Sequence, residues 1–172
     1  MVSAISVASP FTVAQILQWL VEVPDPEIPV LSVVDLGLIR DVSFVDGTCV
    51  VAITPTYSGC PAMLAIAADI ERVLSEHGVA DVRIETRLSP AWTTDWMTEK
   101  GRAALKAYGI APPAQNSASL CGIKRRPSVL VVACPHCGSD NTRVVSHFGS
   151  TACKALYRCV ACGEPFDYFK TH

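Results

Sequence analysis

The amino-acid sequence predicts an α+β fold, in which a small domain of αββαβα order with a mixed or antiparallel sheet precedes a separate all-β module. Three observations support this fold. Segments rich in β-branched residues alternate with segments of helical apolar spacing between residues 12 and 109. Two Cys-x-x-Cys pairs occur after residue 133. Residues 1–110 hold 13 acidic and 7 basic side chains (net −6), whereas residues 111–172 hold 3 and 7 (net +4). We therefore expect a flexible tail at 1–11, an α/β domain at 12–109, a linker at 110–128 and a β module at 129–172.

The first element expected is a helix that begins after Thr12. The pattern Thr12-x-x-Gln15 is a capping box, in which each side chain satisfies a backbone N–H at the helix start. The apolar residues that follow lie on one broad helical face, which predicts packing on a sheet. They are Val13, Ile16, Leu17, Leu20 and Val21.

A proline-rich segment follows this helix, with prolines at positions 24, 26 and 29. Because proline cannot donate a backbone hydrogen bond, this segment is expected to be a rigid extended loop. Asp25, Glu27 and Asp35 lie in it or at the turn after it. They either line a site or are solvated turn carboxylates.

The centre of the domain is predicted to be a hairpin and a helix. Asp46-Gly47 is a strong hairpin signal between strands at 39–45 and 48–54. Pro61 suits the first position of a helix that continues to Gly78. The residues expected to pack on the sheet recur with helical spacing. They are Met63, Ile66, Ala67, Ile70, Val73 and Leu74.

Cys60 is placed by this pattern at the N-cap of the second helix. Unpaired N–H groups and the positive end of the helix dipole favour an anion there, so the thiol is expected to ionise more easily than a free cysteine. The local chemistry also allows Cys60 to be a small buried residue, because free cysteine is among the most buried residue types.

A third strand is expected at 82–88 and a short amphipathic helix at 98–108, which Gly109 ends. Residues 110–128 are rich in Pro, Ser, Ala and Asn and lack periodicity, which indicates a linker. Its basic cluster, Lys124-Arg125-Arg126, is interpreted as a solvated surface. Cys121 is assigned no role.

The C-terminal module contains a strong metal-binding pattern. Cys134-x2-Cys137 and Cys159-x2-Cys162 are separated by 21 residues, and each pair is followed by glycine. Four thiolates close a tetrahedral site, which is typical of structural zinc, and a module of this size needs such support to fold. Alternating segments at 142–148, 154–158 and 166–169 predict three strands, so the module is interpreted as a zinc ribbon.

Two alternatives stay open for the metal and its surroundings. The same cage of four sulfurs also binds iron. Cys153 is either a fifth sulfur near the site or a bystander. Four thiolates with Zn²⁺ reduce the segment's charge from +4 to +2, so nucleic-acid binding is disfavoured and docking of a protein is preferred.

The composition argues against a membrane protein. The sequence has no uncharged apolar run of 18 residues and no basic region ahead of an apolar leader. A cytoplasmic protein is therefore expected. Of the eight cysteines, four form the two Cys-x-x-Cys pairs that point to metal, and no structural disulfide is expected.

Three motifs together resemble a known family. These are Asp25-Pro26-Glu27-Ile28-Pro29, the turn Asp35-Leu36-Gly37-Leu38-Ile39, and Thr54 followed by Gly59-Cys60-Pro61. They resemble the small α/β proteins associated with iron–sulfur cluster assembly. With the ribbon, the whole chain is similar to the D subunits of bacterial phenylacetyl-CoA epoxidase systems.

The resemblance implies a non-catalytic accessory protein of aerobic phenylacetate catabolism. In such systems a di-iron oxygenase works with a reductase that carries flavin and a [2Fe–2S] cluster, and these two proteins are the implied partners. The family's reactive cysteine corresponds to Cys60, and its acidic loop to Asp25 and Glu27. Cys60 is therefore expected to hold iron, an iron–sulfur cluster or a partner thiol transiently. A purely bridging subunit is the alternative.

Overall fold

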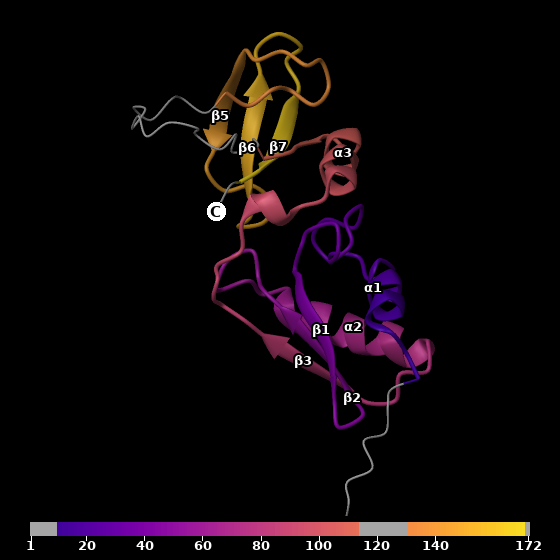
Figure 1. The fold of residues 1–172 in the computed structure, drawn as a ribbon. Helices are drawn as coiled ribbons and strands as arrows, with labels where there is room; N and C mark the ends of the chain where they lie inside the picture. The colour runs from indigo at the N-terminus through magenta and orange to yellow at the C-terminus, as the bar shows by residue number, and fades with distance from the viewer. Residues whose placement is uncertain (1–9, 114–130, 171–172) are drawn as a thin grey trace, which may run out of the picture. The chain divides into compact units, whose positions relative to one another are not determined.

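The computed structural model describes residues 10–113 and 131–170. The chain divides into two compact units, Met1–Trp92 with Trp96–Gly101, and Thr93–Asp95 with Arg102–His172. The expected tail, apart from residues 10 and 11, and most of the expected linker lie outside the described residues. Figure 1 labels all of the elements except η1 and β4. In chain order the elements are α1 (Val13–Leu20), β1 (Ile39–Val45), β2 (Thr48–Ile53), α2 (Met63–Glu76), β3 (Val82–Thr86), η1 (Thr94–Trp96), α3 (Glu99–Ala107), β4 (Ile110–Ala111), β5 (Thr142–Ser146), β6 (Lys154–Cys159) and β7 (Pro165–Phe169).

The sheet of the N-terminal unit has the order β1-β2-β3 and is mixed, which is one of the two sheet types that the sequence left open. β1 and β2 form the expected antiparallel hairpin, and Asp46 and Gly47 take positive φ angles of 51° and 88° at its turn. β2 and β3 run parallel, with α2 as the connection between them. The loop between β2 and α2 therefore lies at the carboxyl end of a parallel strand pair, a common place for binding sites.

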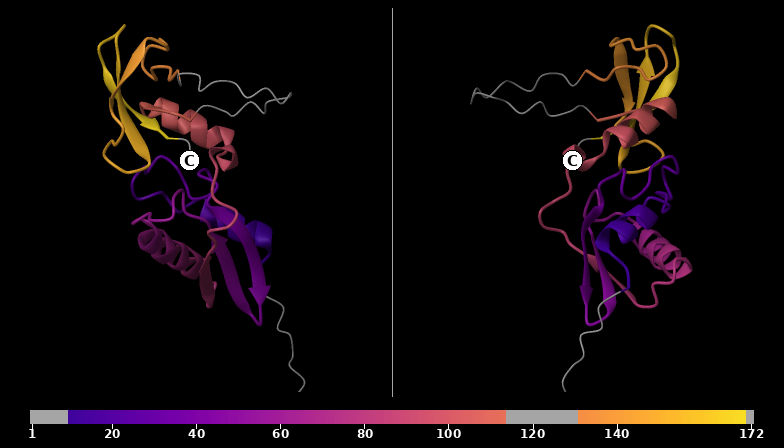
Figure 2. Two further views of the ribbon diagram at one scale, coloured as in Figure 1. Left: turned by 90° about the vertical axis from the view of Figure 1, so that its left-hand side faces the viewer. Right: turned by 45° about the vertical axis from the view of Figure 1, so that its right-hand side comes forward.

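Both α1 and α2 cover the same face of this sheet, as the two views in Figure 2 show. The predicted capping box is confirmed. The hydroxyl of Thr12 accepts a hydrogen bond from the backbone N–H of Gln15, and the side-chain oxygen of Gln15 accepts one from the backbone N–H of Thr12. Ile66, Ile70, Val73 and Leu74 are buried on α2, as their spacing predicts. Burial of this apolar face is what holds the helix on the sheet.

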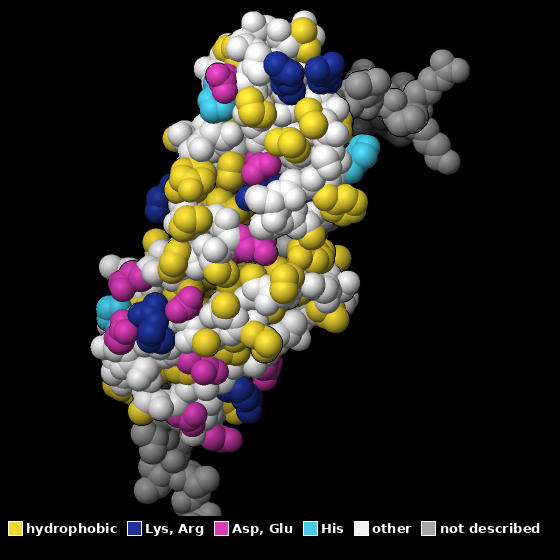
Figure 3. All heavy atoms as spheres, turned by 180° about the vertical axis from the view of Figure 1, so that it is seen from behind, with side chains coloured by type: hydrophobic (Ala, Val, Ile, Leu, Met, Phe, Trp, Pro, Cys, Tyr) yellow, Lys and Arg dark blue, Asp and Glu magenta, His cyan; other side chains and the backbone are white. Residues whose placement is uncertain are grey.

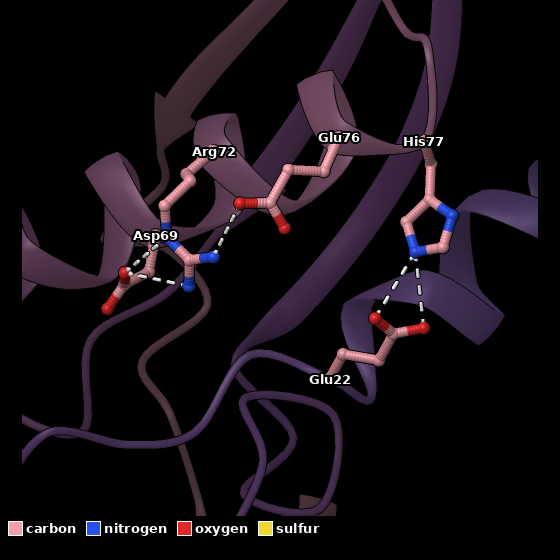
Figure 4. Close-up of polar contacts among 5 residues, drawn as sticks. All are labelled: Glu22, Asp69, Arg72, Glu76 and His77. Carbon is pink, nitrogen blue, oxygen red and sulfur yellow. Dashed lines mark hydrogen bonds and ion pairs between the residues drawn. The ribbon is translucent and has the colours of Figure 1, made fainter.

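Polar contacts tie the ends of these helices together at the surface (Figure 4). The ring of His77, at the C-terminal end of α2, stacks on Trp19 with centroids 4.5 Å apart. His77 Nε2 also lies 3.2 Å from both carboxylate oxygens of Glu22. Arg72 bridges Asp69 and Glu76 along α2. Such exposed ion pairs add little to stability, so the apolar face carries the packing.

The proline-rich loop is more compact than the expected extended segment. Pro24 and Ser32 form an isolated antiparallel bridge, and the loop folds back between them. Asp25 and Asp35 are each only 8% exposed, so neither is a solvated turn carboxylate. The difference arises because backbone donors of the loop bind Asp25, while Asp35 receives donors both from the loop and from the segment that begins α3.

Asp35 joins this loop to the segment before α3. Its Oδ2 accepts a bond of 2.8 Å from the hydroxyl of Ser32, and its Oδ1 accepts one of 3.0 Å from the hydroxyl of Thr98. The backbone N–H of Thr98 also donates to the Asp35 carbonyl at 2.9 Å. Asp35 therefore links two segments of the N-terminal unit through buried hydrogen bonds.

Replacing Asp35 with alanine should destabilise the N-terminal unit by about 2–3 kcal/mol, because two partly or fully buried hydroxyls lose their acceptor. Chemical denaturation of the full chain measures this change. Asp69→Ala is the matched control, since its ion pair with Arg72 is exposed and should cost less than about 0.5 kcal/mol. Equal losses in the two variants would contradict the role given to Asp35.

The C-terminal unit contains a four-stranded sheet of order β4-β7-β6-β5. The three strands expected for a zinc ribbon are confirmed as β5, β6 and β7. The additional strand β4 lies at residues 110 and 111, which the sequence pattern assigned to the linker. Ile110 and Ala111 are 5% and 1% exposed and pair in parallel with β7. A two-residue strand has no periodicity, so only this distant pairing reveals it.

Part of α3 also belongs to the C-terminal unit, which therefore begins before the expected boundary at residue 129. Arg102 is buried and its guanidinium donates to the carbonyls of Thr94 and Pro113. The core of the unit is a cluster of apolar and sulfur side chains. Its members are Ala111, Val132, Cys134, Ala155, Tyr157, Cys159, Phe166 and Tyr168.

The surface reflects the charge asymmetry of the sequence. On the face shown in Figure 3, acidic side chains gather mainly over the N-terminal unit. Among the described residues, no helix combines the length and apolar character needed to cross a membrane.

Candidate functional site

Cys60 lies in the loop that leaves the carboxyl end of β2, but it is not the N-cap of α2. The helix begins at Met63, with Ala62 as its N-cap residue. Cys60 instead closes a turn, in which its N–H donates to the carbonyl of Tyr57 at 3.2 Å. The expectation from Pro61 was wrong because the residues after it form a turn before the helix starts.

The prediction that Cys60 ionises easily is also wrong. Burial raises the pKa of its thiol above the ordinary value, and the carboxylates of Glu27 and Asp25 raise it further. Hydrogen bonds from the N–H of Ala62 and the hydroxyl of Tyr57 lower the pKa without reversing the shift. Cys60 is therefore a half-buried thiol held mainly in its protonated form at neutral pH.

The structure brings the acidic loop beside this thiol. Asp25 Oδ1 accepts the backbone N–H groups of Glu27 and Ile28 at 2.9 and 2.7 Å, which shapes the turn that carries Glu27. Both carboxylates are close enough to act on the charge of Cys60. A thiol with two adjacent carboxylates offers one soft and two hard donors for a metal ion.

Tyr57 is a member of this site that the sequence pattern did not reveal. Its hydroxyl forms a hydrogen bond with Cys60, three residues further along the same loop. A tyrosine in a loop has no periodicity that marks it, so its position before Gly59-Cys60-Pro61 was the only available signal.

The four ribbon cysteines come together as the spacing predicts. Their Sγ atoms all lie within 4.8 Å of one another, with 3.8 Å between Cys134 and Cys162 and 3.6 Å between Cys137 and Cys159. A tetrahedron with Zn–S bonds of about 2.3 Å has edges of about 3.8 Å. The donor set and its spacing therefore fit a tetrahedral metal ion.

The glycine after each pair makes the turn that the sequence predicts. Gly138 and Gly163 have φ angles of 74° and 82°, and their N–H groups donate to the carbonyls of Cys134 and Cys159. The N–H of Cys162 donates to the Cys159 sulfur at 3.5 Å, and together with hydrogen bonds from Cys137 and Ala161 it lowers the pKa of Cys159 to about 7 against the effect of burial. Such N–H donors stabilise thiolate charge at a metal.

Four thiols this close cannot all ionise without a cation. The N–H of Glu164 favours the Cys162 thiolate, but burial and the neighbouring thiols together raise the pKa of Cys162 to about 12. A divalent metal ion removes this conflict, because each ligand then binds as a thiolate.

The remaining predicted residues lie apart from these two sites or outside the described chain. Cys153 is buried, does not belong to the group of four, and has its sulfur 2.9 Å from the hydroxyl of Thr151. Cys121 and the cluster Lys124-Arg125-Arg126 lie outside the described residues.

Comparison with known proteins identifies both parts of the chain. Residues 13–85 match the model of an iron-sulfur cluster assembly protein, and residues 122–170 match the PaaD zinc beta ribbon domain. A protein of Escherichia coli (strain K12), named as the D subunit of 1,2-phenylacetyl-CoA epoxidase, is 48% identical over 162 residues, or 94% of each chain. The chain belongs to the PaaD family.

Further relatives match about half of this PaaD-family chain. An Fe-S protein maturation auxiliary factor of Porphyromonas gingivalis (strain ATCC BAA-308 / W83) is 41% identical over 55% of the chain and 90% of that protein. The crystal structure of a domain of unknown function, DUF59, from Bacillus anthracis is 29% identical, with a TM-score of 0.50 over 54% of the chain and 89% of that domain. The PaaD zinc ribbon contains all four clustered cysteines, so zinc is the metal that their geometry and their domain support.

The reactivity of Cys60 should depend on its neighbours. Glu27→Gln removes a negative charge, lowers the pKa of Cys60 and should speed alkylation by iodoacetamide at pH 7.5 by up to about tenfold, the effect of one pKa unit. Tyr57→Phe should slow it, because the thiolate loses a hydrogen-bond donor. Mass spectrometry of the Cys60 peptide over time measures both rates.

Glu71→Gln, at an exposed position of α2, is the control for a lost carboxylate. Equal alkylation rates in wild type, Glu27→Gln and Glu71→Gln would show that Glu27 does not act on the thiol.

Proposed function

We propose that this chain is an accessory maturation protein of a phenylacetyl-CoA epoxidase system. In this role Cys60 transiently binds iron or an iron–sulfur cluster that is destined for the oxygenase or the reductase, and the ribbon docks that client. The role is non-catalytic, because the metal is cargo rather than a group that reacts with the aromatic substrate.

The observation that carries the proposal is the surroundings of Cys60. A single half-buried thiol lies beside Asp25 and Glu27 at the carboxyl end of a parallel strand pair, in a unit related to Fe-S maturation factors. Thiolate and carboxylate donors together are suitable ligands for iron.

The same surroundings favour transient rather than permanent binding. Within the described residues, the ribbon cysteines form the only group of three or more potential ligands close enough to hold a metal ion. Cys60 and the two carboxylates therefore do not form a closed site. The raised pKa of Cys60 further weakens metal binding, because the metal must displace the proton of the thiol. Ligands of the client would complete the coordination.

The test measures the iron and sulfide content of the candidate reductase in three samples. The reductase is expressed together with the wild-type chain, together with its Cys60→Ser variant, or without this chain. We expect cluster content to fall both without the chain and with the serine variant, while circular dichroism shows that the variant is folded. Cys49→Ala removes a fully buried cysteine of the same unit and should leave cluster content unchanged. Unchanged content in all samples would contradict maturation of this client.

A second candidate is a bridging subunit that holds oxygenase and reductase together. Each unit presents a large exposed apolar side chain that a partner can cover, since Leu64 is 85% and Phe148 69% exposed. A bridging subunit would co-purify with its partners at a fixed stoichiometry that Cys60→Ser does not alter. Full epoxidase activity after its removal by a mild salt wash would argue against it.

A further inference from the structure

Two arginines lie directly opposite each other on the ribbon sheet. Arg143 on β5 pairs with Arg158 on β6, so their side chains leave the same face of the sheet. Within residues 10–113 and 131–170, neither guanidinium forms an ion pair. Because like charges in opposed positions destabilise a sheet, the stability of the ribbon does not explain the pair.

The two arginines share an open pocket. It has a volume of about 270 Å³ and is lined by Arg143, Arg158, Cys159, Val160 and Gly163, and we call it the arginine pocket. The Nε of Arg158 donates to the carbonyl of Gly163 at 3.1 Å, which orients that guanidinium. Both arginines are exposed, so a ligand can reach their remaining N–H groups.

Neutralisation of the zinc–thiolate centre is a weaker explanation for the pair. Successive side chains of a strand point to opposite faces, so the side chain of Arg158 leaves the face opposite to that of Cys159. Cys159 belongs to the buried core cluster, whereas Arg158 is exposed. The exposed side chain of Arg158 and the buried side chain of Cys159 therefore leave opposite faces of β6, although Cys159 itself borders the pocket.

The surroundings favour a protein ligand over a nucleic acid. Val160, in the pocket, and Val145, on β5, are 56% and 54% exposed, and apolar residues with arginine are typical of protein interfaces. Residues 131–170 hold two further cations, of which Lys154 is buried and paired with Asp167. Strong binding to a phosphate backbone needs more positive charge than this.

We propose that the arginine pocket receives a carboxylate side chain from an acidic segment of the client protein. Two guanidinium groups can bind a carboxylate through paired N–H donors. The inference deepens the docking role proposed above for the ribbon, and rests on it. It assigns that role to one pocket and one ligand chemistry.

The test uses the zinc-loaded full chain and a fluorescein-labelled hexaglutamate peptide, with binding measured by fluorescence anisotropy. The variant Arg143→Gln/Arg158→Gln should bind the peptide at least about tenfold more weakly than wild type. Arg83→Gln/Arg87→Gln is the control, because it removes the same charge from exposed positions of the N-terminal unit. Its affinity should stay within about twofold of wild type, since no pocket is lost.

Two further measurements separate the alternatives. Labelled hexathymidylate should bind wild type more weakly than hexaglutamate, and inorganic phosphate at equal concentration should not displace the peptide. Tighter binding of hexathymidylate than of hexaglutamate, or displacement of the peptide by phosphate, would make the pocket a phosphate site and overturn the proposal. Equal peptide binding by all three proteins would also overturn it.

Zinc content and melting temperature test the explanation based on the metal. Both should be retained in Arg143→Gln/Arg158→Gln, because removal of opposed like charges relieves repulsion. A loss of zinc or a lower melting temperature would assign the arginines to the metal centre instead. None of these measurements involves Cys60 or cluster content, so their failure leaves the Cys60 proposal to be judged on its own test.

Discussion

Replacing Cys159 with serine is expected to release zinc and unfold the C-terminal unit. Cys159 is fully buried, and its sulfur lies 3.6 Å from that of Cys137 within the group of four. Serine cannot supply a thiolate, and three thiolates would be left close together without full coordination. Zinc binding contributes about 10–16 kcal/mol to folding in zinc-finger peptides, which exceeds the stability of most domains.

The expected signals are a metal content well below one zinc per chain and loss of the near-ultraviolet circular dichroism of Tyr157 and Tyr168, both buried in the ribbon core. The N-terminal unit should still unfold cooperatively, because its core lies within its own sheet and helices. Cys153→Ser is the matched control, since Cys153 is buried in the same unit outside the metal group. A Cys159→Ser protein with full zinc and unchanged melting would contradict the assignment.

Gly37→Ala is expected to destabilise the N-terminal unit by about 2–5 kcal/mol, from two separate causes. Gly37 has a φ angle of 69°, a left-handed conformation that costs an L-residue about 1–2 kcal/mol. A Cβ atom at this position would also overlap the backbone carbonyl of Trp96. Because the Trp96 ring lies against the Arg40 guanidinium, 3.6 Å away, the segment has little freedom to move.

Gly47→Ala separates the two causes. Gly47 also has a positive φ angle, of 88°, but no atom lies within 4 Å of the added Cβ. This control should therefore show the conformational cost alone, about 1–2 kcal/mol. Urea denaturation of both variants measures the difference. Equal losses would show that the close approach to Trp96 does not matter.

Features that depend on a few neighbouring residues were predicted correctly from the sequence. The capping box at Thr12, the turn at Asp46-Gly47 and the glycine turns after each cysteine pair all follow from local hydrogen bonding or local φ preferences. The spacing of the two pairs was likewise sufficient to predict that their sulfurs converge.

Apart from the start of α2, which a local turn after Pro61 displaces to Met63, the errors concern properties that arise from distant parts of the chain. The pKa of Cys60 depends on burial and on carboxylates more than 30 positions earlier, so a rule about helix ends gave the wrong direction. Strand β4 exists because residues 110 and 111 pair with 167 and 168. No local pattern contains that information.

Local sequence patterns were enough to predict the fold class, most helices and strands, the convergence of the four ribbon cysteines and the candidacy of Cys60. Long-range packing was needed to show that Cys60 is a protonated thiol beside Tyr57 and Glu27, and that Arg143 faces Arg158. Hydrogen-bonding and φ preferences act over a few residues, whereas burial, electrostatic environment and strand register depend on which distant segments pack together.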